Sequence, residues 1–203
     1  MNPLSEMQLD ALMEIFNIGA GRAAASLSQI VGDEIALSVP QIKFVPASEI
    51  NTALISFGSL PLTMVEQTFS GPYEIKASLL FNENNTLSIV RDMMKSQLDL
   101  EDLVEFEEEA MCELGNIILN ACMSAMSAMF DITLNSTLPS YSIGNSEEVL
   151  GLLCANMAQP MMMVMRIDLA IQKHEARGSL IFVLSSHSFH NLLVHVDQYI
   201  ASF

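Results

Sequence analysis

Positive charge is scarce in this sequence. Lysine and arginine together number 8, against 24 aspartates and glutamates, which leaves a formal net charge of −16. Proteins that bind nucleic acid or an anionic membrane surface neutralise phosphates with a basic patch, so this balance argues against both classes of partner. Two interpretations of the acidity stay open: a solvated surface that favours solubility, or attraction of a partner that carries a basic patch.

Cysteines and long apolar runs are scarce as well. The three cysteines, Cys112, Cys122 and Cys154, form no CxxC pair and leave an odd count. No apolar run approaches the roughly 18 residues of a membrane span, since the longest candidate, PMMMVMRIDLAI, contains Arg166 and Asp168. The N-terminal MNPLSEMQLD has neither the basic nor the apolar segment of a secretory signal. Together these features favour a reducing, cytoplasmic setting.

Recognisable motifs for metals, nucleotides and covalent catalysis are also missing. His187 and His190 are one helical turn apart, but no cysteine or acid completes a ligand set near them, so solvated or capping histidines are favoured over a metal site. The glycines of NIGAG lack the preceding strand and the spacing of a phosphate-binding loop. No Ser-His-Asp or Cys-His arrangement has local support. We therefore expect no metal and no cofactor of the protein's own.

Two stretches of the chain repeat one polar pattern. DALMEIFNIGAG, residues 10–21, and EAMCELGNIILN, residues 109–120, each place two acids and an asparagine at spacings of four and three. A proline follows each asparagine by 23 positions. At an offset of 99 positions, the two matching sets are Asp10, Glu14, Asn17 and Pro40, and Glu109, Glu113, Asn116 and Pro139.

The repeat extends, more weakly, over the rest of the chain. Residues 47–57 resemble 145–155, and residues 76–81 resemble 177–182. Each half is predicted to form a helix, a strand, a short helix, two strands joined by a turn, and a helix, with the long helices near 5–31 and 103–130. This period is too long for a solenoid and suits two homologous halves, about 1–101 and 102–203, of a single domain spanning 1–203. The expected fold is α/β (α+β), with one shared, largely antiparallel sheet of about six strands, two long helices that carry the motifs, and further short helices.

The polar pattern falls on one side of each long helix, because successive residues are about 100° apart around the axis. In the first helix this stripe comprises Asp10, Glu14, Asn17, Gly21 and Ser28, and the side expected to face the core comprises Leu12, Ile15, Phe16, Ala23, Ser26 and Ile30. In the second helix the stripe comprises Glu109, Glu113, Asn116, Asn120 and Ser127, with Met111, Leu114 and Ile118 behind it. We expect each stripe to form an exposed ridge that another protein surface can approach.

Either stripe alone is typical of the solvated side of an amphipathic helix. Two acids four positions apart repel each other by a few tenths of a kcal/mol, and asparagine within a helix costs up to about 0.7 kcal/mol relative to alanine. A stripe kept only for solubility has no reason to repeat its residue types and spacing in two places. The repetition therefore favours a functional interpretation.

The pattern D-x3-E-x2-N-x22-P resembles the signature of the CheC, CheX and FliY phosphatases of bacterial and archaeal chemotaxis. Asp10, Glu14, Asn17 and Pro40 fit the signature fully; Glu113, Asn116 and Pro139 fit its last three positions, and Glu109 stands where the family has Asp or Ser. The resemblance covers essentially the whole chain, and the presence of two motifs is more similar to the two-site CheC branch than to the one-motif CheX branch.

The resemblance implies hydrolysis of the aspartyl phosphate on a CheY-type response regulator in chemotaxis signalling. It implies a magnesium ion on the partner receiver and, for some members, the receptor-modifying deamidase CheD as a second partner. The residues implied as catalytic are Glu14, Asn17, Glu113 and Asn116, with Asp10, Pro40, Glu109 and Pro139 supporting the motifs.

The chemistry of these residue types is compatible with that activity. An asparagine amide has both a donor and an acceptor, so it can hold a water in line with phosphorus in a reaction that depends mainly on positioning. A glutamate repels phosphate, but it can pair with the lysine that a receiver keeps beside its phosphoryl group.

The alternative hypothesis is a non-enzymatic protein that binds the receiver or CheD. Because Glu109 departs from the family pattern, we expect the first site to be equal to or stronger than the second.

Overall fold

The computed structural model describes residues 4–46, 61–94, 100–155, 160–171 and 174–202. The short helix expected at 47–57 lies outside these residues. Within them, the order of elements agrees with the predicted order in both halves. The first half contains α1 (Glu6–Val31), β1 (Ile35–Pro46), β2 (Leu62–Ser70), β3 (Glu74–Asn82) and α3 (Glu83–Met94). The second half contains α4 (Leu100–Phe130), β4 (Asn135–Ser136), β5 (Ser140–Gly144), α5 (Ser146–Leu153), β6 (Met161–Ile171), β7 (His174–Leu184) and α6 (Ser186–Ile200).

Local sequence signals set both ends of α1. The side chain of Ser5 accepts a hydrogen bond from the backbone N–H of Gln8, and the side chain of Gln8 accepts one from the backbone N–H of Ser5. This capping box satisfies two donors that the first turn leaves free. Gly32 ends the helix with a φ of 66°, a left-handed conformation that glycine adopts without steric cost.

All strands of the described chain pair in one antiparallel sheet of seven strands, one more than about six because the strand expected before α5 is split into β4 and β5. The order is β1-β6-β7-β3-β2-β4, and β5 also pairs with β2. The first strand of each half therefore adds to the hairpin of the other half: β1 pairs with β6, and β4 and β5 pair with β2. That the two stretches are homologous halves of one domain stays a prediction, which this symmetrical order supports.

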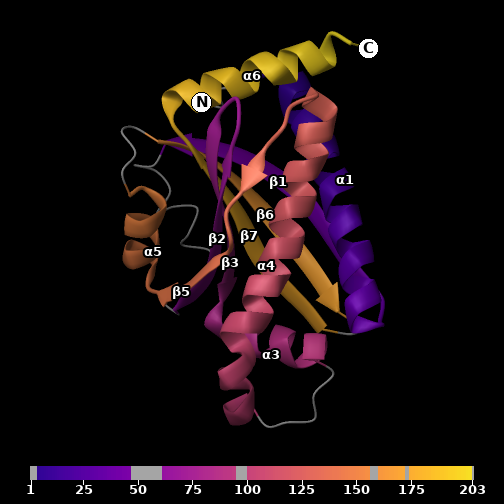
Figure 1. The fold of residues 1–203 in the computed structure, drawn as a ribbon, viewed down its shortest axis with the longest axis vertical. Helices are drawn as coiled ribbons and strands as arrows, with labels where there is room; N and C mark the ends of the chain where they lie inside the picture. The colour runs from indigo at the N-terminus through magenta and orange to yellow at the C-terminus, as the bar shows by residue number, and fades with distance from the viewer. Residues whose placement is uncertain (1–3, 47–60, 95–99, 156–159, 172–173, 203) are drawn as a thin grey trace.

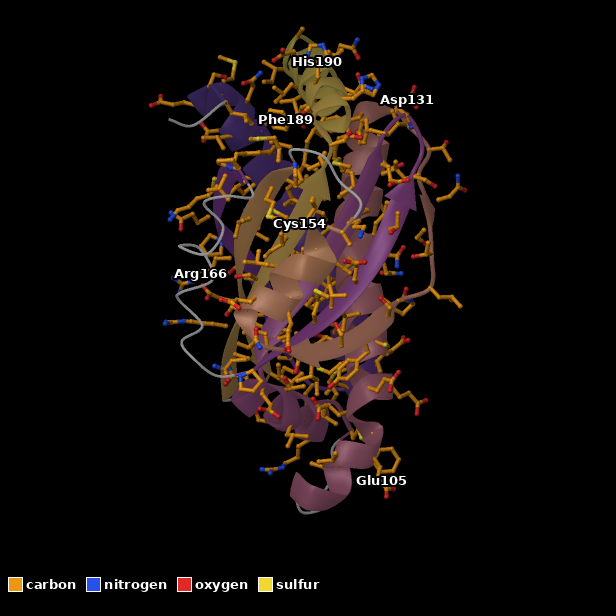
Figure 2. The ribbon with its side chains drawn as sticks, turned by 90° about the vertical axis from the view of Figure 1, so that its left-hand side faces the viewer. Glu105, Asp131, Cys154, Arg166, Phe189 and His190 are labelled. Atoms are coloured by element: carbon orange, nitrogen blue, oxygen red, sulfur yellow. The ribbon has the colours of Figure 1, made fainter. Side chains whose placement is uncertain are left out.

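Helices cover both faces of the sheet (Figure 1). Successive residues of a strand point to opposite faces, so in β3 Leu79 and Phe81 belong to a large apolar cluster with α1, α3, α4 and α6, whereas Leu80 belongs to a smaller cluster with α5. On the larger side, α1 and α4 pack closely, because a Cβ atom on Gly19 would lie only 2.7 Å from the Cα of Cys122. Figure 2 shows the α5 side, with Cys154 at the end of that helix and Glu105 on the part of α4 that extends past the sheet.

The two long helices agree closely with the predicted ranges, but one detail of the predicted core side is wrong. Ser26 and Ile30 of α1 are exposed, Ile30 by 58 %. The helical angle predicts the direction in which a side chain points from the helix axis, whereas its burial depends on whether another element of the chain covers that side. In the last two turns of α1 the covered side is the one that carries Leu27 and Val31.

No helix in the described ranges is both long enough and apolar enough to cross a membrane.

Candidate functional site

The first candidate site is an exposed ridge on α1. Asp10, Glu14 and Asn17 are all exposed, as the helical stripe predicts. Glu14 lies one turn before Asn17, so the carboxylate and the amide are neighbours on the helix surface. No ion pair within the described part of the chain involves Glu14. Its carboxylate is therefore available to a cation supplied by a partner.

The amide of Asn17 joins α1 to the edge strand β1. Its Oδ1 accepts a hydrogen bond from the backbone N–H of Val39 at 3.0 Å. Its Nδ2 donates to the carbonyl of Met13 at 2.9 Å and lies 3.4 Å from the carbonyl of Val39. Both amide hydrogens are thus directed to carbonyls of the chain itself, and the remaining lone pair of Oδ1 is the part of the amide left for a water or a partner.

These bonds give a physical reason for the proline 23 positions after Asn17. The register between β1 and β6 shifts between Ser38 and Gln41, so that Val39 and Pro40 together face the single residue Ile167. Such a bulge removes backbone groups from the ladder. Asn17 satisfies those of Val39, and Pro40 has no N–H to satisfy. Pro40 therefore shapes the strand beside the site, and Asn17 has a structural task in addition to any chemical one.

The second candidate site, on α4, also has two acids, with Glu109 at the position of Asp10, but its asparagine has a different environment. Glu109 and Glu113 are exposed, and no ion pair in the described ranges involves Glu113. Asn116 is only partly exposed. Its Oδ1 accepts hydrogen bonds from Nε2 of Gln67 at 3.1 Å and from Nδ2 of Asn120 at 2.8 Å.

Gln67 is a site residue that the motif analysis missed. It lies in β2, is 1 % exposed, and points to the same face as Val65 and Phe69 of the large cluster. Its Nε2 also donates to the carbonyl of Thr137 at 3.0 Å, and its Oε1 lies 3.3 Å from Nδ2 of Asn120. The available signal was a glutamine at an inward position of the otherwise apolar LTMVEQTF, since buried polar side chains require partners.

The strand beside the second site is interrupted at the matching proline. Ser136 pairs with Phe69 and Ser140 pairs with Glu66, so three residues, 137–139, face two. Pro139 therefore stands in an irregularity of the other edge strand. The residue before each proline differs in burial: Val39 is 1 % exposed, and Leu138 is 89 % exposed. Because β1 and β4 end the strand order, the two sites lie at opposite edges of the sheet.

Among the described residues, the thiols and the tyrosine hydroxyl near the second site have raised pKa values. Burial raises the pKa of the Cys122 thiol to about 12, and burial raises the pKa of Cys112, with Glu108 contributing. Such thiols stay protonated at neutral pH. Tyr141 donates to Oε1 of Glu107 at 2.6 Å, and burial first and this carboxylate second raise the pKa of its hydroxyl above its usual range. In the described residues no three His, Cys, Asp or Glu side chains come together as metal ligands. The chemistry of each ridge is thus that of a carboxylate and an amide.

Comparisons with known proteins find similar sequences. A family model described as the CheC-like family matches residues 7–44, the stretch that contains the first motif. CheY-P phosphatase CheC of Bacillus subtilis (strain 168) is 26 % identical over 148 residues, which are 70 % of this chain and 69 % of that protein. The flagellar motor switch phosphatase FliY of the same organism is 25 % identical over 142 residues, which are 68 % of this chain but only 36 % of FliY.

Solved structures share the fold. The crystal structure of Thermotoga maritima FliY superposes with a TM-score of 0.77 at 20 % identity, covering 97 % of this chain and 99 % of that one. One chain of the crystal structure of the CheX-CheY-BeF3-Mg+2 complex from Borrelia burgdorferi superposes with a TM-score of 0.51 at 14 % identity, covering 82 % of this chain and 96 % of that one.

Proposed function

We propose that this chain, which is similar to the CheC-like family over residues 7–44 and to CheY-P phosphatase CheC of Bacillus subtilis, is a hydrolase that removes the phosphoryl group from the aspartyl phosphate of a CheY-type response regulator in chemotaxis signalling. It acts in the cytoplasm, where such regulators are found, and an asparagine amide on each long helix orients the attacking water. The catalytic residues are Glu14 and Asn17 at one site and Glu113 and Asn116 at the other.

One observation carries this proposal: on each long helix, an exposed glutamate that has no cation partner among the described residues stands one turn before an asparagine whose amide is held by other parts of the chain. A free carboxylate on a ridge suits a lysine presented by a docking partner. A held amide suits a reaction in which positioning supplies most of the rate enhancement. The relatives named as CheY-P phosphatases support the choice of substrate.

The division of roles follows from charge. Glu14 and Glu113 would repel a phosphoryl group directly. Each therefore binds the receiver's lysine that lies beside the phosphoryl group, and this ion pair aligns the receiver. The amide then contacts the water or a phosphoryl oxygen. The magnesium ion that neutralises the phosphoryl oxygens belongs to the receiver, so this chain needs no metal of its own.

The test is release of inorganic phosphate from a purified CheY-type receiver, phosphorylated by a small-molecule donor in a magnesium buffer, with and without this protein. We expect catalytic amounts of the protein to accelerate release beyond the receiver's own rate. Binding of the phosphorylated receiver without faster release would instead support the alternative, a non-enzymatic interaction protein. An interaction with CheD stays a separate prediction, tested by co-purification of the two proteins.

A further inference from the structure

We propose that Gln67 is a positioning residue of the second site: together with Asn120 it clamps Oδ1 of Asn116, so that Nδ2 of Asn116 is presented to the receiver and its water. This inference rests on the proposed function, and it concerns one of the two sites only. Nothing in the motif itself contains Gln67, which lies 49 positions before Asn116.

Main-chain carbonyls determine which way each amide of the clamp points. Nε2 of Gln67 donates to the carbonyl of Thr137 at 3.0 Å, and Nδ2 of Asn120 donates to the carbonyl of Asn116 at 2.8 Å. A carbonyl oxygen only accepts, so in both side chains the nitrogen must face this way. Both nitrogens then also face the side-chain oxygen of Asn116, at 3.1 and 2.8 Å.

The clamp therefore uses the acceptor end of Asn116 and leaves the donor end. Within the described part of the chain Nδ2 of Asn116 donates no hydrogen bond, and this atom is not among the polar atoms sealed from solvent without a partner. Donors on the oxygen of an amide polarise it and strengthen its N–H groups as donors. A strengthened donor pair suits the negative charge of a phosphoryl oxygen or the oxygen of the attacking water.

The equivalent positions of the first site have no such clamp. Gln41 pairs with Arg166 and Ser140 pairs with Glu66, and Gln41 and Ser140 are 99 positions apart. On β6 the residue after Arg166 is Ile167, whereas on β2 the residue after Glu66 is Gln67. The position 99 before Asn120 is Gly21. Both polar members of the clamp are thus absent together from the first site.

Gly115 allows the clamp to form. A Cβ atom on Gly115 would lie 2.5 Å from Cγ1 of Val65. Helix α4 therefore packs so close to β2 that only a residue without a side chain fits at this position. The position 99 before Gly115 is Phe16, whose ring instead stacks on Phe182 with centroids 5.3 Å apart. The close approach places Asn116, the next residue of α4, within reach of the side chain of Gln67.

The test measures Gln67→Leu in two backgrounds. In Asn17→Ala protein only the second site has its asparagine, and there we expect Gln67→Leu to lower kcat by about tenfold or more with KM within about twofold. In Asn116→Ala protein only the first site has its asparagine, and there Gln67→Leu should leave kcat unchanged. An equal loss in both backgrounds would mean a general structural effect, and no loss in the first background would mean that Asn116 needs no clamp; either result overturns the inference.

A second variant, Gln67→Glu, adds a pH readout in the Asn17→Ala background. An ionised glutamate cannot donate to Oδ1 of Asn116, but a protonated one has an O–H donor. We expect kcat relative to the parent to be low at about pH 8 and to recover as pH falls toward about 5.5, whereas the ratio for Gln67→Leu stays flat. A flat ratio for Gln67→Glu would overturn the clamp. Failure of the proposed function is distinct from these outcomes, because then the unmodified protein itself would not accelerate phosphate release.

Discussion

Asn17 and Asn116 occupy the same place in the same motif, yet the chain leaves different atoms of their amides for a partner. Both hydrogens of Asn17 are directed to main-chain carbonyls and its oxygen accepts from Val39, so part of one oxygen remains for a partner. Asn116 has its oxygen occupied by Gln67 and Asn120, so its nitrogen remains. A shared motif therefore specifies where an amide stands on a helix, while neighbouring elements decide which atoms it offers.

The difference also separates stability from activity. Asn17 provides hydrogen bonds to the backbone groups of Val39, which the bulge in β1 leaves without a partner on the adjacent strand. At the irregularity beside Asn116, the hydrogen bonds between the strands are instead made by Gln67 and Thr137. Loss of Asn17 leaves backbone groups of Val39 without their partner. Loss of Asn116 leaves the strand contacts of Gln67 with Thr137 in place.

Removal of both asparagines gives the largest expected effect. In Asn17→Ala/Asn116→Ala protein we expect the catalysed rate of phosphate release to fall by about 100-fold or more, because no amide remains to orient the water. Circular dichroism and binding of the phosphorylated receiver serve as controls for folding and docking. Turnover close to that of the unmodified protein would show that neither asparagine positions the water.

Gly115→Ala should disable one site selectively. The added methyl group would clash with Val65, so α4 must move away from β2 at a cost of about 1–3 kcal/mol in the free energy of unfolding. In the Asn17→Ala background, where only the second site has its asparagine, Gly115→Ala should remove most of the remaining phosphate-release activity. Gly21→Ala is the matched control on α1, where an added methyl group meets no atom within 4 Å and is expected to stabilise the helix by about 0.5–1 kcal/mol. Equal effects of the two changes would contradict the role assigned to the close approach.

The single asparagine variants should separate two properties. The motif alone ranks the first site as equal or stronger, but the hydrogen bonds lead us to expect that Asn116→Ala costs more activity and Asn17→Ala more stability. The stability cost of Asn17→Ala is about 1–2 kcal/mol, the magnitude for leaving a partly buried polar group without its partner. Phosphate release and urea unfolding of both variants check this. If Asn17→Ala lowered activity most, the motif would be the better guide to the stronger site.

Glu109→Asp is expected to have the smallest effect. It restores the residue type that the resemblance places at the first motif position and shortens an exposed side chain that lies one turn before Glu113. We expect a change of at most about 1 kcal/mol in receiver binding, since exposed charge contacts contribute little. The measurement is KM in Asn17→Ala protein at low and moderate salt. A change in kcat rather than KM would indicate that Glu109 takes part in the chemistry.

The sequence predicted what depends on local periodicity. The helical angle placed Glu14, Asn17 and Glu113 on the outer sides of α1 and α4, and the helix predicted near 5–31 agrees with α1 to within a residue at each end. It failed for Ile30, because angle alone does not show which side of a helix end is covered. It also missed Gln67, whose importance comes from a residue on another element.

What the sequence by itself determined about this protein is the set of repeated local patterns: two long amphipathic helices, each with an acid and an asparagine one turn apart, each followed by a strand with a proline. Spacing along one helix converts directly into direction in space, so these features need no tertiary information. Only the tertiary structure decided that the first strand of each half pairs with the other half's hairpin, and that Gln67 reaches Asn116 while Ile167 stands at the equivalent place. The reason is physical: hydrogen bonds between elements far apart in the chain depend on how closely those elements pack, and that distance is set at positions such as Gly115 and Phe16, outside the polar motif.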